Sequence, residues 1–171
     1  LFCGYHKMMK HLTNTLFLST IIFIGSGCLV FGANFKKGLD AARKGNFETA
    51  LREWTPLAEE GDATAQINLG VMYEDGKGVL TNYKTAMKWY KRAAEQGDPR
   101  AQVNLGLMYA KGKGVIPDNI YAYMWLYIAA LTGDGGAILN RDIIAQKMTS
   151  ADIFSTQALA NRCITKKYKR C

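Results

Sequence analysis

Histidine is almost absent from this sequence of 171 residues, which holds only two, His6 and His11. None follows in residues 12–171. The absence excludes histidine-dependent catalytic triads, histidine-containing metal sites and acid–base catalysis by an imidazole from that part of the chain. We expect no metal, no cofactor and no catalytic residue in the folded protein, although the missing histidines exclude only the histidine-dependent sites.

Formal charge is absent from residues 12–35, which are mostly apolar. This stretch follows Lys7 and Lys10 and ends in small residues, a pattern typical of a secretory signal peptide. We predict that residues 1–33 are this signal peptide, that residues 1–7 precede the true start, and that the protein is periplasmic or secreted after cleavage. An uncleaved membrane anchor is an open alternative, because a spanning helix needs about 20 apolar residues.

Cysteine is scarce, and only four are present. Cys3 and Cys28 fall in the predicted leader, where lipidation at Cys28 is a further alternative to cleavage. Cys163 and Cys171 remain, and export to an oxidising compartment predicts a disulfide between them. Eight helical residues span about 12 Å, whereas a disulfide needs Cα atoms within about 7 Å. The last helix should therefore end soon after Cys163 and the chain should turn back. The alternative is two free or intermolecular thiols.

Positive charge is concentrated at the C-terminal end. From Asn34 onward, 20 Lys and Arg face 14 Asp and Glu, and the last ten residues supply +5 of the net +6. No nucleic-acid-binding motif accompanies this tail, so we expect no specific nucleic-acid partner. Two interpretations of the tail stay open, a weak contact with an anionic membrane surface and a plain solvated terminus.

What the sequence does contain is one unit written twice. Residues 65–100 and 101–136 are identical at 17 of 36 positions. A fixed period of this length indicates stacked supersecondary units, each of which contacts its neighbours. We predict an all-α fold, a short right-handed α-solenoid of stacked helical hairpins with about four helix pairs.

Each unit has two helical patterns separated by a glycine-containing loop. Apolar residues recur at three- and four-residue spacing in both patterns, which predicts amphipathic helices. Glycine follows the first pattern, where helices often end in a left-handed residue. The predicted helices are 63–75, 82–96, 99–111 and 118–132. Gly70 and Gly106 are placed where two helices must approach closely.

The units resemble the Sel-like repeat family (SLR), whose helical repeats are similar to tetratricopeptide repeats. Both units fit A-x-x-x-L-G-x-x-Y-x-x-G-x-G-V, followed by A-x-x-W and A-A-x-x-G. Residues 34–64 resemble a degenerate first repeat in which the tight turn Lys44-Gly45-Asn46 replaces the loop. Residues 137–171 are predicted to form a C-terminal capping hairpin with the basic tail.

Three asparagines, Asn68, Asn104 and Asn140, lie 36 residues apart and should form a ladder along successive first helices. An amide both donates and accepts hydrogen bonds, which suits an extended peptide. The tetratricopeptide resemblance implies that these helices line a concave face. We assign the three asparagines and Arg100 to partner binding. The alternative is that the asparagines bond to neighbouring helices or loops and hold the stack together.

The resemblance implies an exported, non-enzymatic scaffold that binds a protein or peptide partner through its concave face. One alternative is a cell-envelope enzyme of the β-lactamase or penicillin-binding type, which has been suggested for cysteine-rich relatives. The cysteine pairs of those relatives are missing from residues 65–136, and Ser150 and Ser155 are the only serines after the leader. A regulator anchored in the membrane by an uncleaved leader is the other alternative.

Overall fold

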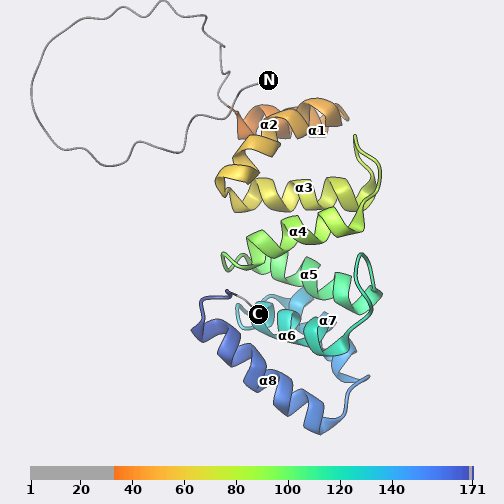
Figure 1. Cartoon of the computed structure of the whole chain (residues 1–171), viewed down its shortest axis with the longest axis vertical. Coiled ribbons are helices and arrows are strands. Elements are labelled where there is room, and N and C mark those ends of the chain that lie inside the picture. Colours follow the sequence, from red (N-terminus) through yellow and green to blue (C-terminus); the bar gives the residue numbers. More distant parts are fainter. Residues whose placement is uncertain (1–32, 170) are drawn as a thin grey trace, which may run out of the picture. The chain divides into compact units, whose positions relative to one another are not determined.

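The structure of the chain, a computed structural model, describes residues 33–169 and residue 171. Within these residues the chain forms eight α-helices and no β-strand (Figure 1), which confirms the predicted all-helical fold. The predicted leader lies outside the described residues, apart from Ala33. None of the described helices has the length and apolar character needed to cross a membrane.

The first pair of helices is joined by a shorter connection than the later pairs. α1 (Phe35–Arg43) and α2 (Phe47–Glu60) flank the predicted turn Lys44-Gly45-Asn46, in which Gly45 has a left-handed φ of 76°. Asn46 caps α2 through its side chain. The indole of Trp54 donates a hydrogen bond to the first carbonyl of α1 over 3.2 Å, so the short turn still gives a closed hairpin.

The repeated region forms four helices, α3 (Ala63–Asp75), α4 (Tyr83–Ala94), α5 (Pro99–Lys111) and α6 (Asn119–Ala130). The predicted first helices, 63–75 and 99–111, match α3 and α5 at both ends. The predicted second helices start one residue too early, because Asn82 and Asp118 cap α4 and α6 from outside, and they end two residues too late. Gly76 and Gly112 end α3 and α5 in left-handed conformations, with φ of 71° and 67°.

Two glycines allow the paired helices to approach closely. Gly70 of α3 lies against the ring of Tyr90 in α4, and Gly106 of α5 lies against α6. A Cβ atom on Gly106 would be 2.8 Å from Cγ of Leu126, well inside the usual carbon–carbon contact of about 3.5–4 Å. The close approach predicted at both glycines is confirmed.

The aromatic side chains of the second helices fill space between helices. Trp54 and Trp125 are only 3% and 2% exposed. Trp89 is half-buried, and the guanidinium of Arg92 lies 4.8 Å from the centroid of its ring. One apolar cluster runs through α3, α4, α5, α6 and the last helix, so the repeats share a continuous core.

The last two helices depart from the repeat. α7 (Gly135–Ala145) and α8 (Ser150–Thr165) begin after the capping residues Asp134 and Thr149. In the earlier pairs the second helix packs against the first, but α8 packs mainly against α6. The predicted capping segment 137–171 holds all but the first two residues of α7 and the whole of α8, and these helices do not pair as the earlier hairpins do.

The sequence of α7 explains this departure. Where α3 and α5 pack on their partner helices they carry the buried pairs Leu69-Gly70 and Leu105-Gly106. The equivalent pair in α7 is Arg141-Asp142, an ion pair of 2.7 Å that remains accessible to solvent. Charged side chains cannot enter a helix interface without a large desolvation cost. α6 has eight of its twelve residues buried, so its apolar surface provides the site that α8 covers instead.

Candidate functional site

The first helices of successive units place the predicted asparagines at equivalent positions. The carboxylates that cap α3, α5 and α7 belong to Asp62, Asp98 and Asp134. Each asparagine of the ladder follows its capping aspartate by six residues. Because the caps fix the helix starts, Asn68, Asn104 and Asn140 share one helical register, and all three are half-buried.

The three asparagines differ in their hydrogen bonds. Nδ2 of Asn140 donates to the carbonyl of Gly136 in its own helix over 2.8 Å. In the part of the chain that the structure describes, the side chains of Asn68 and Asn104 form no hydrogen bond. Bonds to neighbouring helices or loops, which a role in holding the stack would need, are therefore not formed by this pair. Their donors and acceptors are available to a ligand.

A row of aliphatic side chains runs beside the asparagines. Val71, Leu107 and Ile143 each follow an asparagine by three residues, a spacing that places both on one face of a helix. Val71 and Leu107 are half-buried and Ile143 is 45% exposed. We call the surface formed by the three asparagines and these three residues the ladder face. The sequence reasoning missed the aliphatic row, although its period of 36 residues was visible.

Arg100 is engaged with protein groups. Its guanidinium donates to both carboxylate oxygens of Asp98, over 2.8 and 3.2 Å, and reaches the hydroxyl of Thr64 in α3 at 3.4 Å. The hydrogen bond to Asp98 raises the pKa of Arg100. Burial raises the pKa of Asp98, but the bonds from Arg100 outweigh it, so the pKa lies below its ordinary value. Arg100 therefore links α5 to α3 with its charge already balanced.

Two glutamines that the sequence reasoning missed join successive units. Nε2 of Gln66 donates to the carbonyl of Ala58 over 2.9 Å, and Nε2 of Gln102 donates to that of Ala94 over 3.4 Å. Both glutamines are buried. The two carbonyls lie in the last turns of α2 and α4, where helical partners run out. Their recurrence at the repeat spacing was the signal that could have identified them.

An ion-paired network connects the two full repeats. Nζ of Lys113 lies 2.8 Å from a carboxylate oxygen of Glu74, and the hydroxyl of Tyr90 donates to the other oxygen over 3.0 Å. The hydrogen bond to Glu74 raises the pKa of Lys113. Burial, with the charge of Glu74, raises the pKa of Tyr90. The lysine and the carboxylate balance each other, which indicates a structural junction between repeats.

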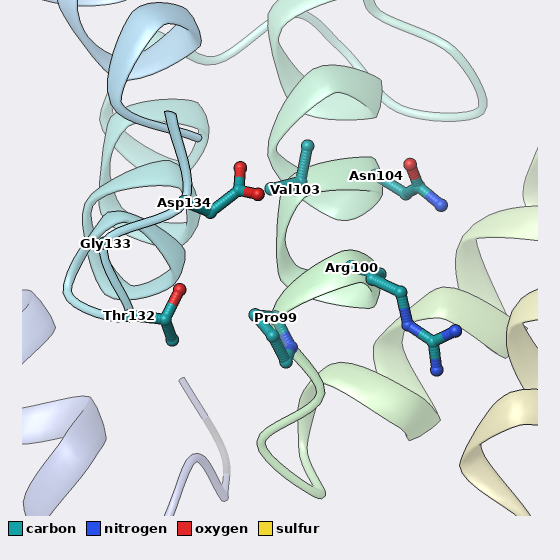
Figure 2. Close-up of a pocket in the computed structure, with 7 residues that line it drawn as sticks. All are labelled: Pro99, Arg100, Val103, Asn104, Thr132, Gly133 and Asp134. Carbon is teal, nitrogen blue, oxygen red and sulfur yellow. The ribbon is translucent and has the colours of Figure 1, made fainter. Parts of the chain in front are cut away.

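A pocket of about 520 Å³ lies where the start of α5 meets the turn between α6 and α7 (Figure 2). Pro99 and Val103 form an apolar wall, and the turn Thr132-Gly133-Asp134 forms the opposite wall. Arg100 and Asn104 also line the pocket, but Figure 2 shows both side chains directed away from Asp134. The pocket thus forms between residues 99–104 and residues 132–134, which only the folded chain brings together.

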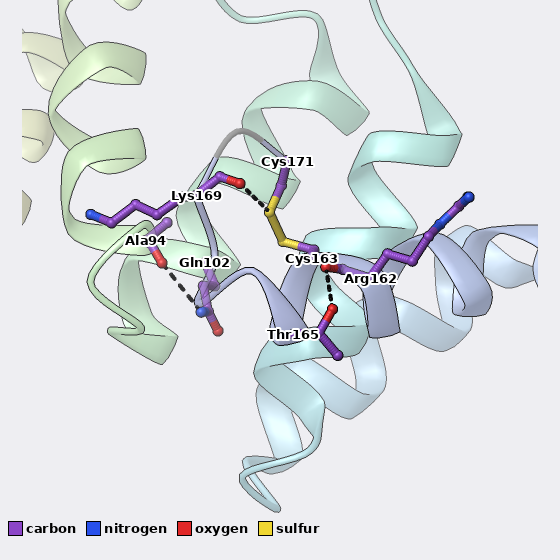
Figure 3. Close-up of a disulfide and its surroundings, with 7 residues drawn as sticks. All are labelled: Ala94, Gln102, Arg162, Cys163, Thr165, Lys169 and Cys171. Atoms are coloured by element: carbon purple, nitrogen blue, oxygen red, sulfur yellow. Dashed lines mark hydrogen bonds between the residues drawn. A yellow bond between two sulfur atoms is a disulfide. The ribbon is translucent and has the colours of Figure 1, made fainter.

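The C-terminal cysteines are joined in the structure by a disulfide, with their Cα atoms 5.3 Å apart (Figure 3). α8 ends at Thr165, two residues after Cys163, and the chain then reverses through Lys167 and Tyr168, which have left-handed φ of 51° and 62°. The ring of Tyr168 lies over Gly97 in the turn before α5. The loop closed by the disulfide thus covers the junction between α4 and α5.

The two serines of the enzymatic alternative both lie in α8. The hydroxyl of Ser155 donates to the backbone carbonyl of Asp152 over 2.9 Å. Ser150 is the first residue of α8, and neither hydroxyl is hydrogen-bonded to a basic side chain within residues 33–169 and 171. In the same residues, no three acidic, cysteine or histidine side chains lie together as ligands for a metal ion.

Comparison with known proteins agrees with this architecture. The family model for the Sel1 repeat matches residues 63–98 and 99–134. A crystal structure of c5321, a protective antigen present in uropathogenic Escherichia coli strains and displaying an SLR fold, is similar with a TM-score of 0.71 and 30% identity, over 78% of this chain and 30% of that chain. A Sel1 repeat protein from Oxalobacter formigenes is similar with a TM-score of 0.60 and 32% identity, over 63% of this chain and 44% of that chain.

The chain thus spans less than half the length of either of these solved proteins. A search of curated proteins found no match. The two matched repeats begin and end at the helix boundaries of the structure, since residues 63–98 hold α3 and α4, and residues 99–134 hold α5 and α6. The chain therefore carries two Sel1 repeats, each formed by one pair of helices.

Proposed function

We propose that this protein is an exported, non-enzymatic scaffold whose ladder face binds an extended segment of a protein or peptide partner. The observation that carries the proposal is the pair Asn68 and Asn104, half-buried at equivalent positions and without hydrogen bonds in the described residues. Each amide offers both donors and an acceptor, which is what the backbone of an extended segment requires. A peptide that crosses the first helices would meet these groups in turn.

The aliphatic row narrows the form of that segment. Val71 and Leu107 are half-buried and Ile143 is exposed beside the asparagines. These aliphatic side chains favour apolar side chains on the bound segment, while the asparagines bind its backbone.

Export is supported by the sequence of the leader and by the bonded cysteines. Disulfides persist in oxidising compartments such as the periplasm and the cell exterior. The Cys163–Cys171 disulfide fits such a compartment. The exposed lysines of the closed loop, Lys166, Lys167 and Lys169, support a weak contact with an anionic membrane surface.

The proposal is tested by capturing partners from the cell-envelope fraction with matched variants. The double variant Asn68→Ala and Asn104→Ala removes several hydrogen bonds worth about 0.5–1.5 kcal/mol each, so capture should fall at least about tenfold. Asn161→Ala, an exposed asparagine of α8, serves as the control and should capture as the wild type does. A lowered melting temperature with unchanged capture by the double variant would show that the asparagines support the fold.

The enzymatic alternative has a separate test. We expect no hydrolysis of nitrocefin above background by the purified protein, because neither serine is hydrogen-bonded to a basic side chain in the described residues. Turnover that disappears in Ser150→Ala would contradict the scaffold proposal.

A further inference from the structure

Three junctions between units start with the same capping aspartate but differ two residues later. Asp62 is followed by Thr64, Asp98 by Arg100, and Asp134 by Gly136. In all three cases the aspartate accepts a hydrogen bond from the first turn of the helix that it caps. The junctions therefore share one backbone arrangement and differ in the side chain that follows the cap.

At the junction of α3 and α5, the residue that follows the capping aspartate by two positions is Arg100. Both carboxylate oxygens of Asp98 accept hydrogen bonds from Arg100, and the same guanidinium reaches Thr64 on α3. A capping aspartate of this repeat can thus cap its helix and bind a guanidinium at once. The charge-assisted pair outweighs the unfavourable position of a cation near a helix N-terminus.

At the junction of α5 and α7 the equivalent residue, Gly136, has no side chain, and the pocket of Figure 2 lies there. Oδ1 of Asp134 caps α7 by accepting from the amide of Ala137 over 2.7 Å. Oδ2 of Asp134 has no hydrogen bond or ion pair within the described residues. Asp134 is thus equivalent to Asp98, which binds Arg100 at the preceding junction, but no arginine of this junction pairs with it.

The walls of the pocket match the two parts of an arginine side chain. Pro99 and Val103 offer an apolar surface for methylene groups. Opposite them, Figure 2 shows the hydroxyl of Thr132 and the carboxylate of Asp134 on the same wall. The Thr132 hydroxyl donates to the carbonyl of Ala129 over 2.7 Å, so its oxygen can still accept. A planar guanidinium can use both acceptors, whereas an anion would be repelled by Asp134.

We propose that this pocket binds the guanidinium of an arginine side chain, supplied by the partner segment that crosses the ladder face. The guanidinium pairs with Asp134 and donates to Thr132, in the way that Arg100 pairs with Asp98. The positive charge of Arg100 does not prevent this, because Asp98 balances it and its side chain is directed away from Asp134. That the arginine belongs to the partner segment rests on the proposed function, but the binding of a guanidinium in the pocket does not.

Titration with a small probe followed by NMR tests the pocket without any partner. Nα-acetyl-L-arginine N-methylamide is added to the 15N-labelled protein, and amide shifts are recorded. We expect shifts concentrated at Val103 and at the turn Thr132-Gly133-Asp134, with a dissociation constant in the millimolar range typical of one small ligand. The matching citrulline derivative, which has the same shape and no charge, should bind at least about tenfold more weakly.

Three variants then assign the site. Asp134→Asn keeps a capping side chain but removes the charge, and should weaken the probe about tenfold. Gly136→Arg places an arginine where the preceding junction has Arg100, and should abolish the shifts by occupying Asp134. Asp142→Asn removes one charge from the exposed surface of the same helix and should leave the titration unchanged. Melting curves confirm that each variant is folded.

Equal shifts with the citrulline derivative, or a titration unaffected by Asp134→Asn and Gly136→Arg, would contradict the proposal that the pocket binds a guanidinium. That result would not bear on partner binding by the ladder face, since the asparagine variants are tested with a captured partner. Conversely, a probe that binds as expected while the asparagine variants capture normally would uphold the pocket and contradict the proposed function.

Discussion

Gly106→Ala offers a direct test of the close helix packing on which the repeat depends. Alanine at an interior helix position is usually worth about 1 kcal/mol more than glycine, so propensity alone predicts stabilisation. In this structure the added Cβ would lie 2.8 Å from Cγ of Leu126 and 3.1 Å from the carbonyl oxygen of Ala122. The leucine can change rotamer, but the carbonyl belongs to the backbone of α6 and moves only with that helix.

Overpacking a well-packed core costs about 1–3 kcal/mol, and subtracting the gain in propensity of about 1 kcal/mol leaves a net loss of up to about 2 kcal/mol. We therefore expect Gly106→Ala to lower the free energy of unfolding by up to about 2 kcal/mol, measured by urea denaturation of the disulfide-bonded protein. Gly135→Ala is the matched control, because no atom lies within 4 Å of the Cβ position at Gly135. The control should be neutral or slightly stabilising. If Gly106→Ala were as stable as the control, α5 and α6 would not be in the contact described.

Two further predictions concern the C-terminal loop and the α3–α5 junction. Cys171→Ala should lower the free energy of unfolding by about 2.5 kcal/mol, the chain entropy of a loop with a sequence separation of 8. The reduced wild type should have the same urea midpoint as this variant. If both had the midpoint of the oxidised wild type, the disulfide would not stabilise the fold. Asp98 has a pKa below its unfolded value, so its stabilising effect is present above about pH 4 and is lost as pH falls through the folded pKa. Asp98→Asn should therefore flatten the fall in melting temperature between pH 5 and pH 2, while the exposed Glu60→Gln should not.

Much of the helical framework could be predicted from the sequence because its signals are local and repeated. Capping aspartates and left-handed glycines recur every 36 residues, and the helices 63–75 and 99–111 follow from them to the residue. The same period placed Gly70 and Gly106 at helix contacts. The packing of α8 was harder, because it depends on competition between two surfaces. Arg141-Asp142 makes α7 a poor partner, while α6 has an apolar surface left to cover.

In the candidate site too, the periodic features could be predicted from the sequence and the contacts between segments could not. Periodicity placed Asn68 and Asn104 in one register, but periodicity cannot show whether an amide has found a partner within the fold. Arg100 could be assigned to the same helix as Asn104, yet its pairing with Asp98 depends on side-chain geometry. The pocket was beyond sequence reasoning, because its walls come from segments about 30 residues apart that meet only when α7 packs beside α5.

Repetition makes the differences between equivalent residues informative. The three junctions share a capping aspartate and a helix start, so the different chemistry at each arises mainly from the residue two positions later. Thr64 accepts a hydrogen bond, Arg100 forms an ion pair with Asp98 of its own junction and reaches Thr64 on α3, and Gly136 leaves a carboxylate open beside a pocket. Arg141-Asp142 acts similarly, since charge at a position that is apolar in earlier units ends the regular pairing of helices. The repeat accounts for the backbone, and the positions where this chain departs from its own repeat are where we expect its specific recognition to lie.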